Sequence, residues 1–199
     1  MSRDLVLASG SEIRAQMLRN ANVPFRVRVA RVDEDALKQS LEAEGTRPRD
    51  MADALAEMKA QRVAAKEPGA MVLGCDQVLD FGGRVFSKPE TRDAAAGQLR
   101  QLRGQRHSLF SAAVIFDEGR PVWRHVAEVR MRMHDVSDSY LEGYLDRNWP
   151  AVGSSVGAYQ VESEGIRLFS SVSGDYFSIL GMPLIEVLSF LALRGLIET

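Results

Sequence analysis

The chain has 199 residues, of which 45% are hydrophobic and 26% are charged, a composition typical of one globular domain. Its formal net charge of −2 argues against a nucleic-acid-binding protein, which needs a strongly basic face.

The first 69 residues alternate between strand and helix patterns. The apolar residues 5–8 predict a short buried strand, and a turn at residues 9–11 leads into apolar positions at helical spacing. Ser9 and Glu12 have the spacing of a capping box at the start of this helix. The next elements are a strand with one wet face over residues 25–29, a helix after residue 35 that ends near residue 44, and a longer helix that ends near residue 68.

The middle of the chain is richer in strand patterns. Residues 71–89 predict two strands, broken at residues 74–76, then a turn at residues 82–83 and a third strand. The following elements are a helix capped by Thr91 and a hairpin of two long strands, residues 108–116 and 121–133.

The last third begins with a short helix capped by Ser137, followed by loop-rich residues 151–165. A strand over residues 166–172 and an apolar helix over residues 183–193 complete the pattern. We therefore predict an α/β fold with a mixed central sheet flanked by helices. Residues 1–199 are expected to fold as one domain, with room for two lobes around a cleft.

The turn from the first strand into the first helix is a candidate phosphate site. A helix N-terminus presents free backbone N–H groups and the positive end of the helix dipole. Ser9 and Ser11 add hydroxyls, and Arg14 in the first turn can form paired hydrogen bonds with a phosphate. Helix capping by Ser9 is the alternative, because the turn has neither a Walker-type nor a Gly-x-Gly-x-x-Gly pattern.

Carboxylates after strands form a second candidate group. Glu34 lies in the acidic run Asp33-Glu34-Asp35, and Asp76 follows the apolar residues 71–73. Such carboxylates hold Mg²⁺ or Mn²⁺ against a polyphosphate, whereas capping is the alternative for Asp33 or Asp35. Because an uncompensated carboxylate is costly to bury, we expect a metal ion or a lysine beside Asp76.

Lysine is scarce, with only four residues in the chain. Lys88 precedes Pro89, and a tight turn at residues 82–83 would return it to the same end of a ribbon as Asp76. Lys59 lies on the longer helix, where the alternative is a surface lysine extended along apolar side chains.

Histidine and cysteine are weaker candidates. His107, His125 and His134 lack the spacing of metal ligands and are expected to be structural. The single cysteine, Cys75, is a poor nucleophile beside a carboxylate, excludes an intrachain disulfide and favours a reducing cytoplasm. No apolar stretch approaches the roughly 20 residues of a membrane span, so we expect a cytoplasmic protein without membrane contacts.

Seven motifs occur in order along nearly the whole chain. They are LVLASGSEIRAQML at residues 5–18, VDE at 32–34, EMKA at 57–60, GCDQV at 74–78, SKP at 87–89, GAYQVESEGIRLF at 157–169 and GDYFSILGMPL at 174–184. Together they resemble the Maf family of nucleoside triphosphate pyrophosphatases, whose fold is related to that of inosine-triphosphate pyrophosphatases. The resemblance implies a homodimer that hydrolyses the α–β phosphoanhydride of non-standard nucleotides, a house-cleaning role, releasing nucleoside monophosphate and pyrophosphate.

The resemblance also implies roles for the matching residues. Glu34 and Asp76 would hold a divalent metal ion, Mg²⁺ or Mn²⁺, and Asp76 would accept a proton from the attacking water. Lys59 and Lys88 would neutralise developing negative charge. Ser9 and Arg14 would contact the phosphates, and Ser11 belongs to the same substrate-binding turn. These parts suit phosphoryl transfer, which depends on positioning and charge neutralisation.

Three further positions concern the base. Gln77 and Glu162 resemble the branch that prefers 7-methyl-GTP, whereas the thymidine and uridine triphosphate branch usually has Thr and Gln there. A carboxylate near the base suits a purine with N–H donors, especially one made cationic by N7 methylation. Ile13 departs from both branches, which have Arg or Trp, and cannot stack on a methylated guanine as Trp can. Ser111 stands where the family commonly has Thr and keeps the hydroxyl.

Other functions remain open. A nucleotide-binding regulator of cell division with vestigial catalysis is favoured by the altered residues 12–13, and would bind triphosphates without turnover. A sugar-nucleotide or phosphosugar enzyme of the same fold class would release inorganic phosphate or a sugar phosphate. A preference for thymidine or uridine triphosphate is the alternative within the same reaction.

Overall fold

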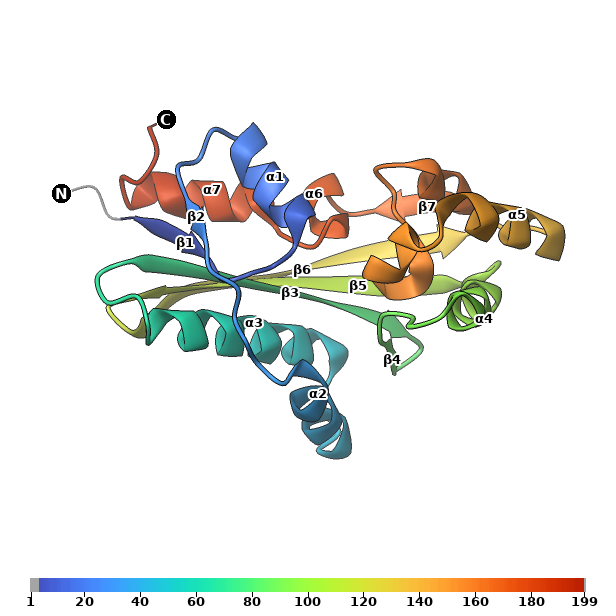
Figure 1. The fold of residues 1–199 in the computed structure, drawn as a ribbon, viewed down its shortest axis with the longest axis horizontal. Coiled ribbons are helices and arrows are strands. Elements are labelled where there is room, and N and C mark those ends of the chain that lie inside the picture. Colours follow the sequence, from blue (N-terminus) through green and yellow to red (C-terminus); the bar gives the residue numbers. More distant parts are fainter. Residues whose placement is uncertain (1–3, 199) are drawn as a thin grey trace.

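One seven-stranded sheet runs through the computed structural model, which describes residues 4–198 (Figure 1). The strand order is β2-β1-β3-β5-β6-β7, with β4 paired to β3 beside this row. The strands are β1 (Leu5–Leu7), β2 (Arg26–Val27), β3 (Met71–Phe81), β4 (Arg84–Phe86), β5 (Arg106–Asp117), β6 (Arg120–Met133) and β7 (Phe169–Ser173). β1 pairs in parallel with β2 and β3, and the other pairs are antiparallel, so the predicted mixed sheet is confirmed.

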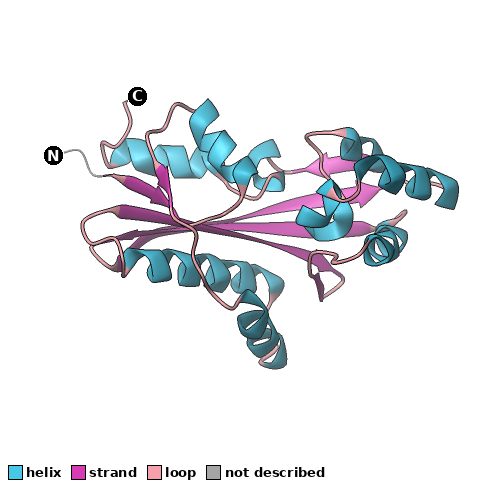
Figure 2. Cartoon of the chain, viewed as in Figure 1, coloured by secondary structure: helices cyan, strands magenta, loops and turns pink. Residues whose placement is uncertain are grey.

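Helices lie on both faces of this sheet (Figure 2). They are α1 (Glu12–Asn20), α2 (Glu34–Ala43), α3 (Pro48–Ala64), α4 (Arg92–Leu102), α5 (Asp138–Asn148), α6 (Tyr176–Ile179) and α7 (Leu184–Leu193), with short 3-10 helices η1 (Ala151–Ser154), η2 (Val156–Ala158) and η3 (Glu164–Leu168). α2 and α3 lie on one side of the sheet, and α1, α6 and α7 lie on the other (Figure 1). The α/β class predicted from the sequence is therefore confirmed.

The long β5–β6 hairpin was also predicted correctly. Its turn uses Glu118 and Gly119, whose φ angles of 51° and 73° are both positive. Two successive positive φ angles characterise a type I′ turn, whose twist matches that of the paired strands. Cross-strand pairing then extends from Asp117↔Arg120 to Arg106↔Arg132.

β3 is continuous, so the predicted break at residues 74–76 is wrong. Gly74 stays in the strand, paired with Val114 on β5. It is needed because α3 packs directly onto it: a Cβ atom at Gly74 would lie 2.7 Å from the backbone nitrogen of Ala60. Glycine here permits a close helix–strand approach, and it places α3 directly over the centre of β3.

The start of α1 differs from the expected capping box. Ser11, not Ser9, is the N-cap residue, and its side chain makes no capping hydrogen bond. Glu12 instead forms an ion pair with Arg19, two turns along the same face of the helix, with 2.5 Å between Glu12 Oε1 and Arg19 Nη1. Ser9 accepts a hydrogen bond from the Ser11 backbone N–H at 3.2 Å, so its hydroxyl stays in the turn.

Two predicted strands are shorter than expected. β2 contains only two residues, both exposed, because it pairs with β1 on one side and with no described strand on the other. The strand predicted over residues 166–172 begins at Phe169, because the preceding residues form η3.

The buried side chains include Cys75, which was expected to be a poor nucleophile. It is fully buried between β1, β5 and α7 side chains, and burial raises the pKa of its thiol to about 11, against the opposing effects of Arg14 and Lys59. Burial, rather than the neighbouring carboxylate, is thus the main reason that it is a poor nucleophile. None of the helices in residues 4–198 combines the length and apolar character needed to cross a membrane.

His107 is the buried histidine, while His125 is half-buried and His134 is exposed. The His107 Nε2 atom and the Tyr159 hydroxyl lie 2.8 Å apart in a hydrogen bond. Burial lowers the pKa of His107 from 6.5 to about 4. The folded protein therefore keeps this ring neutral at pH values where the unfolded chain protonates it.

A pH dependence of stability follows from His107. As pH falls from 6.5 to 4, the unfolded chain binds a proton that the folded protein does not, so the free energy of unfolding should fall by about 3 kcal/mol through this residue. Urea unfolding at several pH values tests this. His107→Gln should flatten the slope in this window, whereas His134→Gln should leave it unchanged; an equal slope in His107→Gln would contradict the assignment.

Candidate active site

A cleft of about 580 Å³ opens beside the β1–α1 turn. Other walls come from the start of α2, from α3, from β3 and from residues 154–162. Every residue that the sequence analysis placed in the site lines this cleft: Ser9, Ser11, Ile13, Arg14, Glu34, Lys59, Asp76, Gln77, Lys88 and Glu162. The fold thus brings together side chains from six of the seven motifs.

The centre of the cleft is an ionic cluster. Lys59 Nζ lies 2.6 Å from Asp76 Oδ1 and 2.9 Å from Glu34 Oε2. The side chains of Lys59 and Asp76 are only 9% and 7% exposed, while that of Glu34 is 40% exposed. The expected lysine beside Asp76 is therefore present, and the surface alternative for Lys59 is wrong. The close packing of α3 on Gly74 is what lets Lys59 reach Asp76.

The carboxylates also suit a divalent cation. Asp76 Oδ2 is buried and has no hydrogen-bond partner among residues 4–198, so one oxygen of this carboxylate is available to a ligand. Those residues contain no cluster of three or more His, Cys, Asp or Glu side chains that would form a metal site alone. Mg²⁺ commonly uses one or two carboxylates, with water and substrate phosphates as its other ligands. Glu34 and Asp76 fit that pattern.

Two residues of the acidic run at the start of α2 have different surroundings. Asp33 is the N-cap of α2 and accepts a hydrogen bond from the Ala36 backbone N–H at 3.0 Å, which confirms the capping alternative for this residue. Glu34, one residue on, points into the cleft. Burial raises the pKa of Glu34, but the positive charges of Lys59, Lys38 and Lys88 outweigh it and lower the pKa below its ordinary value.

Lys88 reaches the cleft through the β3–β4 hairpin. Phe81 pairs with Arg84 across the residue 82–83 turn, and the chain then returns alongside β3. Although Lys88 remains accessible to solvent, partial burial of its ammonium group lowers its pKa. The positive charges of Arg14 and Lys59 act in the same direction, against Glu34 and Asp76. The cleft therefore concentrates positive charge in a way that an anionic ligand would relieve.

Arg14 is held in place by the protein itself. Its Nε donates to the Gly181 carbonyl at 2.8 Å, and Nη1 donates to the Cys75 carbonyl at 3.1 Å and to Ser9 Oγ at 3.3 Å. Nη2 donates to no group among the described residues. The guanidinium is thus fixed at the cleft wall, with Nη2 as its only nitrogen that has no partner among the described residues.

Gln77, Ile13 and Glu162 form a different part of the cleft. Gln77 is half-buried on β3, Ile13 is half-buried on α1, and Glu162 is exposed between η2 and η3. Sequence reasoning missed Tyr159, whose buried ring also lines the cleft. Its only sequence signal is its place in the motif at residues 157–169.

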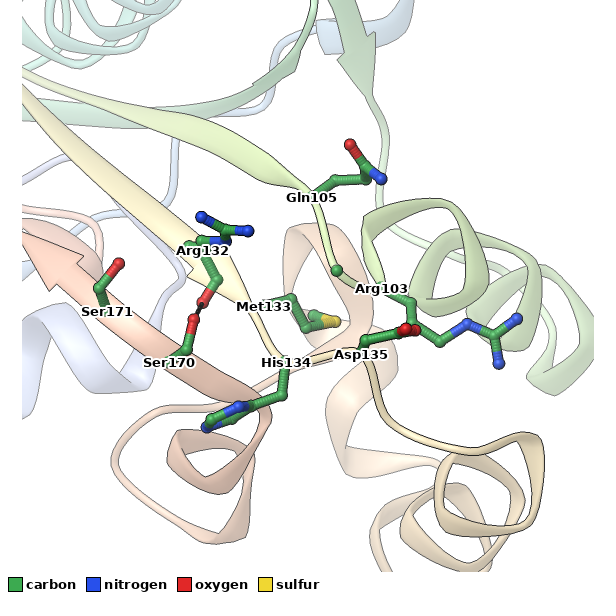
Figure 3. Close-up of a pocket in the computed structure, with 9 residues that line it drawn as sticks. Arg103, Gln105, Arg132, Met133, His134, Asp135, Ser170 and Ser171 are labelled. Atoms are coloured by element: carbon green, nitrogen blue, oxygen red, sulfur yellow. Dashed lines mark hydrogen bonds between the residues drawn. The ribbon is translucent and has the colours of Figure 1, made fainter.

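A second cavity, of about 680 Å³, lies near the start of β5 and the end of β6 (Figure 3). Its lining includes one carboxylate, that of Asp135, and no lysine. Arg103 points away from Asp135 in Figure 3 and donates to Asp138 and to the Val136 carbonyl. This cavity lacks the paired carboxylates and lysines of the cleft beside the β1–α1 turn.

The model of the Maf-like protein family matches residues 4–193, which is nearly the whole chain. The chain belongs to the Maf-like family. The resemblance inferred from the sequence motifs is therefore confirmed. Curated relatives of this Maf-like chain include a nucleoside triphosphate pyrophosphatase of Ruegeria pomeroyi, 60% identical over 199 residues and covering 100% of both chains.

Two more distant relatives carry two different names. A nucleoside triphosphate pyrophosphatase of Caulobacter vibrioides is 48% identical over 191 residues, covering 96% of each chain. A 7-methyl-GTP pyrophosphatase of Brucella abortus is 44% identical over 189 residues, covering 95% of each chain.

Proposed function

We propose that this Maf-like protein hydrolyses the α–β phosphoanhydride of nucleoside triphosphates in a reaction that depends on Mg²⁺ or Mn²⁺. The observation that carries the proposal is the buried Asp76 carboxylate, held by Lys59 through one oxygen while the other has no described partner. The protein is an enzyme: its family and its relatives at 44–60% identity identify it as a hydrolase of the nucleoside triphosphate pyrophosphatase class.

The protein's own residues account for the main requirements of the reaction. Lys59 fixes Asp76 through Oδ1, which leaves Oδ2 to accept a proton from the attacking water. Arg14 and Lys88 line the cleft and would place positive charge beside the polyphosphate, and the α1 N-terminus would add backbone N–H donors. Glu34 and Asp76 would hold the metal ion, which when bound neutralises phosphate charge and lowers the pKa of water.

The finer substrate assignment is 7-methyl-GTP. Glu162 and Gln77 support it, because both line the cleft and a carboxylate suits a cationic methylated purine. The name of the Brucella abortus relative gives further support. The family resemblance also supports a homodimer that acts on nucleotides, without nucleic acid partners. The single free cysteine supports a location in the cytoplasm.

A substrate panel tests the proposal. Wild-type protein is incubated with 7-methyl-GTP, the four standard ribonucleoside triphosphates, thymidine triphosphate and modified pyrimidine triphosphates, with Mg²⁺, with Mn²⁺ or with EDTA. We expect metal-dependent release of pyrophosphate, fastest from 7-methyl-GTP. A preference for thymidine or uridine triphosphate would contradict the base assignment, and tight binding without turnover would support a regulator with vestigial catalysis.

Lys88→Met separates activity from stability. Activity should fall by about 10²-fold, because a cation near the phosphates is lost. Stability at pH 7 should rise, because the lowered pKa means that the folded protein disfavours the charged lysine. The wild type becomes relatively more stable as pH approaches 10.5, so the advantage of the variant should shrink over that range. Thermal melts from pH 7 to 10.5 measure this, with exposed Lys66→Met as the control; a Lys88→Met variant less stable at pH 7 would contradict it.

A further inference from the structure

The side-chain amide of Gln77 is held in one orientation by three oxygen atoms. Its Nε2 lies 3.0 Å from Ser111 Oγ, 3.0 Å from the Ser178 carbonyl and 2.9 Å from the Ile179 carbonyl. Backbone carbonyls only accept hydrogen bonds, so the group that faces them must be the NH₂. The opposite orientation would place Oε1 against two carbonyl oxygens and lose both bonds to them.

Ser111 completes this arrangement from the neighbouring strand. It lies directly opposite Gln77 in the β3–β5 pairing and is fully buried. Its hydroxyl donates to the Ser178 carbonyl at 2.6 Å, so its oxygen is left to accept from Gln77. The Ser178 backbone N–H in turn donates to Asp175 Oδ1 at 2.8 Å, which anchors the segment that supplies the carbonyls.

The consequence is that Gln77 presents an acceptor to the cleft. Both Nε2 hydrogens are directed at the protein, whereas Oε1 accepts no hydrogen bond from residues 4–198. Glu162, in the same cleft, is a second acceptor, and Ile13 has no polar side-chain group. A ligand that meets these side chains gains hydrogen bonds only through its own donors.

We propose that Ser111 is a positioning residue that locks Gln77 as a hydrogen-bond acceptor, so that the cleft selects bases that present N–H donors on the six-membered ring. The inference rests on the proposed function and gives a physical basis for its preference for a guanine base, which carries both a ring N–H and an amino group. A purine without these donors would leave Oε1 of Gln77 desolvated and unpaired, which weakens binding.

Discrimination between two triphosphates measures this selection. GTP carries the donors, and purine riboside triphosphate has the same ring system without them. Wild-type kcat/KM should favour GTP by at least about tenfold. Ser111→Ala should lower this preference by about fivefold, which is the effect of losing one hydrogen bond. The change should appear as a higher KM for GTP, while kcat stays within about twofold of wild type. Ser111→Thr keeps the hydroxyl and should retain the preference.

The orientation of the amide can be measured without turnover. By NMR, the side-chain NH₂ protons of Gln77 should exchange with solvent at least about tenfold more slowly than those of Gln61, which is exposed on α3. In Ser111→Ala the Gln77 exchange should accelerate while that of Gln61 stays the same. Equally fast exchange of both glutamines in the wild type would overturn the proposed lock.

The two readouts also distinguish the failure of each proposal. If Ser111→Ala folds and lowers kcat/KM equally for GTP and purine riboside triphosphate, the hydroxyl does not act through base recognition and the inference is wrong. If the wild type does not prefer GTP over purine riboside triphosphate, the inference is equally wrong. If the wild type releases pyrophosphate from no triphosphate, the proposed function fails, whereas the NMR exchange still tests the orientation of Gln77.

Discussion

Asp76→Asn should lower the rate of pyrophosphate release by about 10³-fold while the fold survives. The substitution keeps the size of the side chain and its place on β3, but it removes the negative charge and the proton-accepting oxygen. Lys59 keeps a carboxylate partner, because Glu34 Oε2 lies 2.9 Å from its Nζ. Loss of activity should therefore not be accompanied by unfolding, which circular dichroism and thermal melts can check.

Asp80→Asn is the matched control for this substitution. Asp80 lies four residues along β3, outside the cleft, and its Oδ1 accepts a hydrogen bond from the Gly83 backbone N–H at 2.7 Å. An asparagine can still accept that bond, so activity and stability should both stay within about twofold and 0.5 kcal/mol of wild type. An Asp76→Asn protein as active as this control would show that Asp76 does not accept the proton.

Lys59→Met should destabilise the fold by about 3 kcal/mol as well as abolish activity. Methionine fills the volume, but the buried Asp76 carboxylate loses its only ionic partner among the described residues, and an unpaired buried charge is strongly unfavourable. Because Mg²⁺ or Mn²⁺ would supply the missing positive charge, either ion should raise the melting temperature of this variant more than that of the wild type.

Urea denaturation with and without Mn²⁺ measures both effects. Lys66→Met is the control, because Lys66 is exposed just beyond the end of α3. It should unfold at nearly the same urea concentration as the wild type. A Lys59→Met protein with wild-type stability would mean that the pair with Asp76 contributes little. An equal response of both proteins to Mn²⁺ would place the metal away from these carboxylates.

Much of the fold could be predicted because its elements follow local periodicity. The β5–β6 hairpin and the starts of α4 and α5 depend on alternation, turn residues and caps that lie close together in the chain. The break predicted in β3 was wrong for a non-local reason. Gly74 has a strand conformation, and its missing side chain makes room for α3, which no pattern within residues 71–89 reveals.

The candidate site could likewise be predicted only in part. The residue types of the cleft could be predicted, because metal binding and phosphate binding need carboxylates, lysines and a helix N-terminus in recognisable motifs. Their pairing could not, because Lys59 and Asp76 meet only through helix packing. The contacts of Gln77 could not be predicted either. Two of its partners are backbone carbonyls 101 and 102 residues away, and any residue type supplies a carbonyl.

Phosphorus NMR of the products tests the central claim most directly. Wild-type protein is incubated with GTP or 7-methyl-GTP and Mg²⁺, and the phosphorus signals are followed until the substrate is consumed. We predict nucleoside monophosphate and pyrophosphate in equal amounts, with neither product formed by Asp76→Asn over the same time. Nucleoside diphosphate with orthophosphate, or an Asp76→Asn time course equal to that of the wild type, would contradict cleavage of the α–β bond at this cleft.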